Sequence, residues 1–387
     1  MIAFLLFLSA ITGFYLPPFD TTHFLLVPLD HHLKNARKIE ISYTLMHPYD
    51  KQKETILLIE DALDKYFQES IDMQPLLDEF NIVHIKGRNE ADAILKIIKS
   101  TGEIDWVKAY QLLNMDQQAR DIELVRKDLS GDRPVHLVGF SGAAAYLHYY
   151  LGLFPENVKS LISFNPLLFD LQKNLNLINP SQCLESIPLE NASYLEFLWY
   201  NNSENLCKEQ TGTEDIDLAF YTYLKWQFLL PSIVDADKAD IALKIRLFEH
   251  SYGLTYNAAA NLLESKIAKW MMLESHEIWK QFERIPFSVY GVNYDRGLDF
   301  SGKVLIVGSV HDKLLSRFCY DVLAEFYLNS TLLLIRDGHS FGKLGGSMLH
   351  TNLIRSFINN DIKEKISVYQ MLRDKGLLIN KKDRVRY

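Results

Sequence analysis

The chain has 387 residues, of which 48% are hydrophobic and 23% are charged, as in an average globular protein. This composition excludes a disordered chain, a collagen and a coiled coil, and the length is ample for a large buried core. The net charge is −8, and basic residues are spread along the chain apart from a short tail at 381–386, which argues against nucleic acid as a partner. Three cysteines are too few for a scaffold built on disulfides.

The N-terminal segment at 2–16 is almost wholly apolar, with small residues near its end and Pro17 and Pro18 after it. This pattern is typical of the hydrophobic region and cleavage zone of a secretory signal peptide, although no basic residue precedes it. The segment is shorter than the roughly 20 residues of a membrane span, and no other stretch could form one. We predict a signal peptide at 1–16 and an exported protein, periplasmic or secreted. The alternative is a buried first element of the fold.

Export would change the chemistry of the cysteines. Cys183 and Cys207 lie in one polar, loop-like region, whereas Cys319 stands alone in a helical pattern. In an oxidising compartment we predict a disulfide between the first two and a buried thiol at the third. The alternative is three buried cysteines that behave as small hydrophobic residues.

Short apolar runs rich in Val, Ile and Leu recur along the chain, and several are unbroken, as expected for parallel strands covered on both faces. They predict strands at 23–28, 39–46, 55–59, 81–85, 135–139, 160–164, 303–308 and 331–335. Helical patterns separate most of these runs, at 90–99, 106–129, 142–153, 316–328 and 347–359. The alternation predicts an α/β fold with a mostly parallel sheet of eight strands. No helix separates the first two strands, so we expect them to pair antiparallel at one edge.

The alternation of strands and helices stops near residue 168 and resumes near residue 300. The residues between are helical in pattern and rich in aromatic side chains, as in YLEFLWY at 194–200. We interpret 168–299 as a mainly helical cap, inserted into a core formed by 17–167 and 300–387. A cap at the end of the sheet would shield a site from water and select its substrates.

The most informative segment contains a strand at 135–139 that leads into Phe140-Ser141-Gly142-Ala143 and then into a helix of small residues. A strand, a sharp turn and a helix form the context of a nucleophilic serine, because so tight a turn needs small residues around it. The Ser141 hydroxyl would stand above the end of the strand, beside the N–H groups of the helix N-terminus. The alternative is an ordinary turn in which Ser141 caps the helix.

Two later strands end in loops that carry an acid and a base. LIVGSVHDKLLS at 305–316 presents Asp312, and LLLIRDGHSF at 332–341 presents His339. Together with Ser141, these residues follow the C-terminal ends of strands, where an open α/β sheet places its site. His339 would take the proton of Ser141, and Asp312 would orient the imidazole and stabilise its cation.

On these motifs the chain resembles the α/β-hydrolase superfamily. Residues 139–143 match its G-x-S-x-G pattern except that the last glycine is Ala143. The loop at 308–312 resembles its strand–G-x-x-D loop with one extra residue, and 338–340 resembles its late G-H-S segment. The resemblance implies an α/β-hydrolase fold and a catalytic triad in the family's chain order of Ser, Asp and His. It also implies that the Gly142 N–H is a donor of the oxyanion hole.

The part of the chain before the nucleophile resembles the proline-iminopeptidase and tripeptidyl-aminopeptidase branch of that superfamily. The resemblance is carried by VPLDH at 27–31, by the strand pair and by the helix QQARDIELVRKDL at 117–129. Two motifs of the branch are altered. Its H-G-G-P-G is replaced by the sequence EDALD at 60–64, and of its D-x-R-G-x-G-x-S only Arg88 clearly survives.

The resemblance implies a serine hydrolase that forms an acyl-enzyme, and an aminopeptidase-like peptidase on short peptides is the favoured form. Glu60 and Asp61 are candidate ligands of the substrate ammonium group. Acidic residues in this loop oppose a developing oxyanion, which leaves two alternatives open. One is a carboxylesterase-like or lipase-like hydrolase, and the other is a catalytically impaired hydrolase-fold protein that binds a ligand or partner.

We expect a small-molecule or short-peptide substrate and no cofactor or metal. The chain has no Walker loop and no G-x-G-x-x-G after a strand, and Lys280 stands where a zinc-protease pattern at 276–280 needs its second histidine. The substrate and the oligomeric state are left open by the sequence.

Overall fold

The computed structural model describes the ranges 21–59, 73–88, 91–99, 102–168, 170–171, 241–250, 291–312, 317–339, 341–345 and 349–385, with single positions at 275, 278, 281 and 315. Within these residues the chain forms one nine-stranded sheet in the order β1-β2-β4-β3-β5-β6-β7-β8-β9. The strands are β1 (Thr21–Pro28), β2 (Lys38–Leu45), β3 (Glu54–Ile59), β4 (Phe80–Gly87), β5 (Val135–Phe140), β6 (Val158–Phe164), β7 (Lys303–Ser309), β8 (Asn329–Ile335) and β9 (Leu378–Val385).

The middle of the sheet is parallel, as predicted. Strands β4, β3, β5, β6, β7 and β8 pair with one another in that order and all in parallel. The predicted antiparallel pair of β1 and β2 is confirmed, with Thr21 opposite Leu45 and Pro28 opposite Lys38. The largely apolar sequence of β5, in which His136 is the one polar side chain, has a simple reason, since every residue of this central strand is buried.

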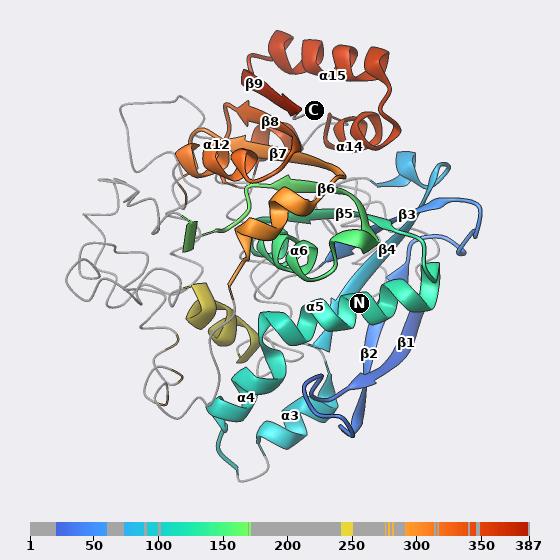
Figure 1. Cartoon of the computed structure of the whole chain (residues 1–387), viewed down its shortest axis with the longest axis vertical. Coiled ribbons are helices and arrows are strands. Elements are labelled where there is room, and N and C mark those ends of the chain that lie inside the picture. Colours follow the sequence, from blue (N-terminus) through green and yellow to red (C-terminus); the bar gives the residue numbers. More distant parts are fainter. Residues whose placement is uncertain are drawn as a thin grey trace, which may run out of the picture.

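The ninth strand was not predicted, so the expected count of eight is wrong. β9 pairs antiparallel with β8 at the edge of the sheet, where Figure 1 shows it close to the C-terminus. Its sequence, LINKKDRV, carries four charged side chains and reads as a basic tail. Charged residues, lysine above all, are common on edge strands because they discourage pairing with other chains. Pairing with β8 therefore decides the conformation of this segment.

The helices follow the predicted pattern with a few differences, of which the short α13 is one. They are α3 (Asp92–Ile98), α4 (Trp106–Leu113), α5 (Met115–Ser130), α6 (Ser141–Leu153), α12 (Arg317–Glu325), α13 (Gly342–Gly345), α14 (Leu349–Asn359) and α15 (Ile362–Asp374). Short 3-10 helices are η1 (Gln74–Leu76), η3 (Pro155–Asn157) and η8 (Tyr294–Asp299).

The predicted helix at 106–129 is two helices, and α15 was not predicted. The break lies at Asn114, whose backbone is extended and whose side chain accepts the N–H of Gln117 to cap α5. The sequence signal of this cap, a single asparagine within QLLNMDQQ at 111–118, is weak beside the continuous helical pattern around it.

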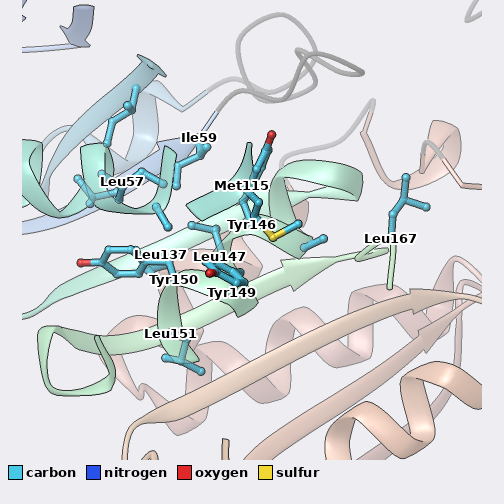
Figure 2. Packing of buried hydrophobic residues seen from close by; sticks show 14 of the residues in the cluster. Leu57, Ile59, Met115, Leu137, Tyr146, Leu147, Tyr149, Tyr150, Leu151 and Leu167 are labelled. Carbon is cyan, nitrogen blue, oxygen red and sulfur yellow. The ribbon is translucent and has the colours of Figure 1, made fainter. Parts of the chain in front are cut away.

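Two hydrophobic clusters lie on opposite faces of the sheet. Along β5, Leu137 belongs to the cluster under α5 and α6, whereas Val138 belongs to the cluster under α14 and α15. Alternation of side chains along a strand divides the residues in this way. Figure 2 shows the first cluster, in which Leu147 and Tyr150 of α6 lie among the residues of β5. Among the described residues, helices thus pack on both faces of the sheet at β5.

Several predictions fall on residues outside the described ranges. These are the signal peptide at 1–16, the Cys183–Cys207 disulfide, Glu60, Asp61 and most of the cap at 168–299, so each of them stays a prediction. Cys319 is buried in α12, as expected. Among the helices that the structure describes, none is long and apolar enough to cross a membrane.

Candidate active site

The structure brings Ser141, His339 and Asp312 together in one hydrogen-bonded chain. Ser141 Oγ lies 2.9 Å from His339 Nε2, and His339 Nδ1 lies 2.9 Å from Asp312 Oδ2. When Nδ1 carries the imidazole proton, it donates to Asp312 and Nε2 accepts from the serine hydroxyl. The three residues are only 3%, 5% and 8% exposed, respectively. They follow β5, β8 and β7, respectively. Because these strands are parallel, their C-terminal ends lie at the same edge of the sheet.

The serine lies on a strained turn between β5 and α6. Phe140 is still extended, whereas Ser141, the next residue, has a left-handed backbone with φ of 55°. A non-glycine residue pays for this conformation, and such strain is tolerated where the surrounding structure enforces it. The turn projects the hydroxyl away from the strand and toward the imidazole, which is the arrangement predicted for a nucleophile at an elbow.

Gly139 makes the tight turn possible. A Cβ atom added at this position would lie 2.7 Å from Leu147 Cδ1 and 3.0 Å from the backbone of Ala144. Helix α6 therefore packs directly on the end of β5 only because residue 139 has no side chain. Ala143 replaces the last glycine of the motif and is buried, so the additional methyl group is accommodated there.

Gly142 directly follows the serine in the first turn of α6. The first four N–H groups of a helix have no acceptor within the helix, and the helix dipole adds positive potential there. The backbone N–H of Gly142 is therefore chemically suited to stabilise an oxyanion. Glu60 and Asp61, the predicted ligands of the substrate ammonium group, lie outside the described residues.

Asp312 is held by donors besides the histidine. Tyr320 Oη lies 2.6 Å from Asp312 Oδ2, and the backbone N–H of Leu315 donates to Oδ1 at 3.3 Å. The loop that carries Asp312 is one residue longer than the family pattern, yet the carboxylate still reaches His339. Burial raises the pKa of Tyr320 well above its ordinary value, so its hydroxyl keeps the proton that it donates.

Asn165 is a site residue that the sequence analysis missed. Its side-chain amide donates to the carbonyl of His339 at 2.6 Å and to Ser309 Oγ at 2.9 Å. Its carbonyl accepts the N–H of Ser309 at 2.7 Å. The residue follows β6, has a left-handed φ of 40°, and is fully buried. Asn165 thus connects the ends of β6 and β7 to the histidine loop, and a polar residue directly after a buried strand was its only signal.

Asp337 organises the other side of the histidine loop. Its carboxylate accepts the N–H groups of Gly338, Lys343 and Leu344, at 2.9–3.0 Å. Burial raises its pKa to about 6, although these three N–H groups act in the opposite direction. The loop therefore contains a buried carboxyl group two residues from His339.

Arg88, the survivor of a branch motif, lies in a buried network of its own. Its guanidinium donates to both carboxylate oxygens of Asp121, at 2.7 and 2.8 Å, and to the carbonyls of Leu29 and Leu112. Asp30, in the VPLDH segment, accepts hydrogen bonds from Gln111 and Gln117. Arg88 therefore contacts the VPLDH segment at the carbonyl of Leu29. In this structure the hydrogen bonds of both motifs stabilise the fold of the first half of the chain.

No group of three His, Cys, Asp or Glu side chains in the described part of the chain is placed to hold a metal ion. The hydrogen-bonded chain of Ser141, His339 and Asp312 brings together a hydroxyl, an imidazole and a carboxylate. A base at hydrogen-bond distance from a hydroxyl can activate it as a nucleophile.

A family model of the alpha/beta hydrolase fold matches residues 98–342, more than half of the chain. Solved structures similar to the chain include a putative lipase from Acinetobacter baumannii, at 13% identity and a TM-score of 0.48 over 92% of this chain and 97% of the other. A hydrolase from Oleispira antarctica has 17% identity and a TM-score of 0.40 over 80% and 92%. An epoxide hydrolase from Bacillus megaterium has 13% identity and a TM-score of 0.46 over 84% and 98%. No curated protein matches the chain. On the family model, the chain belongs to the α/β-hydrolase family.

Proposed function

We propose that this protein is a serine hydrolase that forms an acyl-enzyme on Ser141. The observation that carries the proposal is the buried chain of hydrogen bonds from Ser141 through His339 to Asp312. A serine hydroxyl is a weak nucleophile unless a base is placed to remove its proton, and His339 Nε2 is at hydrogen-bond distance for that step.

In the first half of the reaction, Ser141 Oγ attacks the carbonyl carbon of the substrate while His339 Nε2 takes its proton. Asp312 stabilises the imidazolium, and the Gly142 N–H donates to the oxygen that becomes negative. When the tetrahedral intermediate collapses, the leaving group takes the proton from His339 Nε2. The products of this half are the free leaving group and an ester between Ser141 and the acyl group.

In the second half, a water molecule attacks the ester carbonyl and gives a proton to His339. Collapse breaks the bond to Ser141 Oγ, which recovers its proton from the imidazolium, and a carboxylic acid leaves. Asp312 orients the imidazole and balances its charge in both halves of the reaction. The protein returns to its starting state without a cofactor.

For the substrate we propose short peptides with a free N-terminus. The support is the resemblance of 27–31 and 117–129 to the aminopeptidase branch. Glu60 stands where that branch has histidine, and Asp61 stands where it has glycine. These two acidic residues would bind the substrate ammonium by charge-assisted hydrogen bonds. The proposed signal peptide at 1–16 and the helical cap at 168–299 would place this activity outside the cytoplasm under a substrate-selecting lid.

The nucleophile is tested by labelling with a fluorophosphonate, which phosphonylates an activated serine. We expect the label on Ser141 of the wild type and no label on Ser141→Ala. Ser42→Ala is the matched control, because Ser42 lies on β2, three positions from β5 in the strand order of the sheet. This substitution should leave labelling unchanged. A folded wild type that takes no label, or an equally labelled Ser141→Ala, would overturn the proposal.

The substrate class is tested by comparing free and N-acetylated aminoacyl-arylamides with p-nitrophenyl esters. We expect turnover of the free amides and a loss of about 10-fold or more on N-acetylation, since blocking removes one charge-assisted pair. Glu60→Gln with Asp61→Asn should raise KM for the free amides alone. Activity confined to esters would favour the esterase alternative. No turnover by a folded, labelled protein would favour the binding protein.

A further inference from the structure

The acid of the triad has a buried partner that comes from a different element. Tyr320 lies in the first turn of α12, whereas Asp312 lies in the loop between β7 and that helix. The phenol donates to Asp312 Oδ2 at 2.6 Å, and this is the same oxygen that accepts from His339 Nδ1 at 2.9 Å. One carboxylate oxygen therefore joins the tyrosine to the imidazole.

The strand beneath the tyrosine is shaped to receive its ring. A Cβ atom added at Gly308, near the end of β7, would lie 2.6 Å from Tyr320 Cγ and 2.9 Å from Cε2. These separations are far below van der Waals contact, so the ring takes up the space that any other residue at 308 would fill. Tyr320 is only 1% exposed, which gives its hydroxyl no access to water as an alternative partner. The ring is thus fixed by packing, and its hydroxyl is fixed by Asp312.

The chemistry of this contact follows from which groups are charged. A hydrogen bond to a carboxylate from a buried donor favours the ionised form and fixes the orientation of both oxygens. Leu315 N–H holds Oδ1 at 3.3 Å, so the carboxylate has a donor on each oxygen besides the histidine. By sharing Oδ2, the phenol draws charge away from the oxygen that faces the imidazole. The contact therefore orients the acid and limits how strongly it attracts a proton on His339.

We propose that Tyr320 is a positioning residue of the active site, which orients Asp312 and sets the basicity of His339. The inference rests on the proposed serine-hydrolase function. Other titratable groups next to this pair, among the described residues, are Cys319 in α12, His311 beside Asp312, and Asp337 in the histidine loop.

The test is the rate of fluorophosphonate labelling as a function of pH in Tyr320→Phe, which keeps the ring and removes only the hydroxyl. We expect the rate constant to fall roughly 10-fold, the effect of losing one hydrogen bond to a charged group. We also expect the acid limb of the pH profile to move to higher pH. Without the phenol, Asp312 attracts the proton of the imidazolium more strongly, so His339 becomes neutral, and able to act as a base, only at higher pH.

Tyr150→Phe is the matched control. Tyr150 is an equally buried tyrosine in α6 whose hydroxyl donates to Glu123 at 2.7 Å, in the packing of α5 against α6. It should lose stability by a similar amount while keeping the labelling rate and the pH profile of the wild type. A folded Tyr320→Phe that labels at the wild-type rate with an unshifted acid limb would overturn the inference and leave the proposed function standing. A wild type that takes no label would instead overturn the proposed function.

A second pair of variants keeps the test open if Tyr320→Phe does not fold. In an Asp312→Asn background the carboxylate charge is absent, so removing the phenol leaves no buried charge without a donor. If Tyr320 acts through Asp312, then Asp312→Asn and Asp312→Asn/Tyr320→Phe should label at the same residual rate with the same pH profile. A further loss in the double variant would contradict the inference, because it would show that the tyrosine acts by another route.

Discussion

Asn165 satisfies three buried polar groups of the histidine loop and its neighbour strand with a single side chain. Replacing it with alanine leaves the His339 carbonyl and the Ser309 N–H without this partner in a buried site. We expect Asn165→Ala to lower the free energy of unfolding by about 2–4 kcal/mol and to slow fluorophosphonate labelling of Ser141. Asn359→Ala is the control, since this exposed side chain bonds only Glu79 at the surface, and it should change stability by less than about 0.5 kcal/mol. Urea denaturation of both variants checks the prediction, and equal stabilities would contradict it.

Asp337 makes a pH-dependent contribution to stability. Its pKa is about 6 in the folded protein against an ordinary value of 3.8, so between these values the folded state binds the proton that the unfolded state releases. Proton binding by Asp337 therefore contributes fully to stability below pH 3.8, and this contribution is lost as the pH rises through about 6. We expect the stability of the wild type relative to Asp337→Asn to fall by about 2 kcal/mol from pH 4 to pH 7.

The measurement is urea denaturation of wild type and Asp337→Asn over that pH range. Other carboxyl groups titrate in both proteins, so the difference between the two isolates Asp337. The variant also loses an acceptor for the N–H groups near 338–344, but this loss does not vary with pH. A stability difference that stays constant with pH would contradict the raised pKa.

At the scale of elements, the junction of β5 and α6 depends on close packing at one glycine. Gly139→Ala would place a methyl group 2.7 Å from Leu147 and 3.0 Å from the backbone of Ala144, which cannot move without shifting the helix. We expect this substitution to lower the free energy of unfolding by about 2–3 kcal/mol and to weaken labelling of Ser141. The cost arises at the elbow, so both properties should fall together.

Gly152 offers a control within the same helix. A Cβ atom there would meet its nearest neighbour, the carbonyl oxygen of Asn293, at 3.6 Å, an ordinary contact. Since alanine is favoured over glycine in a helix by about 1 kcal/mol, Gly152→Ala should be neutral or slightly stabilising. Chemical denaturation of the two variants separates close packing from general intolerance of substitution in α6. A Gly139→Ala protein as stable as Gly152→Ala would contradict the account of the elbow.

At the scale of the whole molecule, Arg88 joins four parts of the first half of the chain. It follows β4, pairs with Asp121 of α5, and donates to carbonyls at the end of β1 and of α4. Removing one member of a buried ion pair leaves the other charge uncompensated. We expect Arg88→Met or Asp121→Asn each to cost about 3–5 kcal/mol, and the double variant to cost less than their sum.

An exposed ion pair provides the comparison for Arg88. Lys382 of β9 pairs with Asp321 of α12, and its side chain is 53% exposed. Lys382→Met should cost less than about 1 kcal/mol, because water screens the charges and replaces the contact. Thermal and urea denaturation of all four variants test the prediction. A loss on Arg88→Met as small as that on Lys382→Met would show that the network is not a source of stability.

Central strands and the loops after them could be predicted from the sequence. A strand such as β5 is buried on both faces, so its composition is mostly apolar, and this signal is local. The turn into α6 demands small residues, which is also local. Because parallel strands end at one edge, the loops after them lie close together. The resemblance to the α/β-hydrolase family then indicated that Ser141, Asp312 and His339 meet there.

The tertiary structure alone decided the features that depend on distant partners. The charged β9 becomes a strand only because β8 offers it an unpaired edge, and Asn165 matters only because the loops after β7 and β8 come within reach of its amide. In the sequence, Tyr320 does not differ from other aromatic residues of the core. Only the fold places Gly308 of β7 under its ring and Asp312 beside its hydroxyl. Local sequence thus determined which segments are buried and where the reactive side chains stand. Contacts between residues far apart in the chain determined what holds those side chains in place, because packing and buried hydrogen bonds depend on where the fold brings each partner.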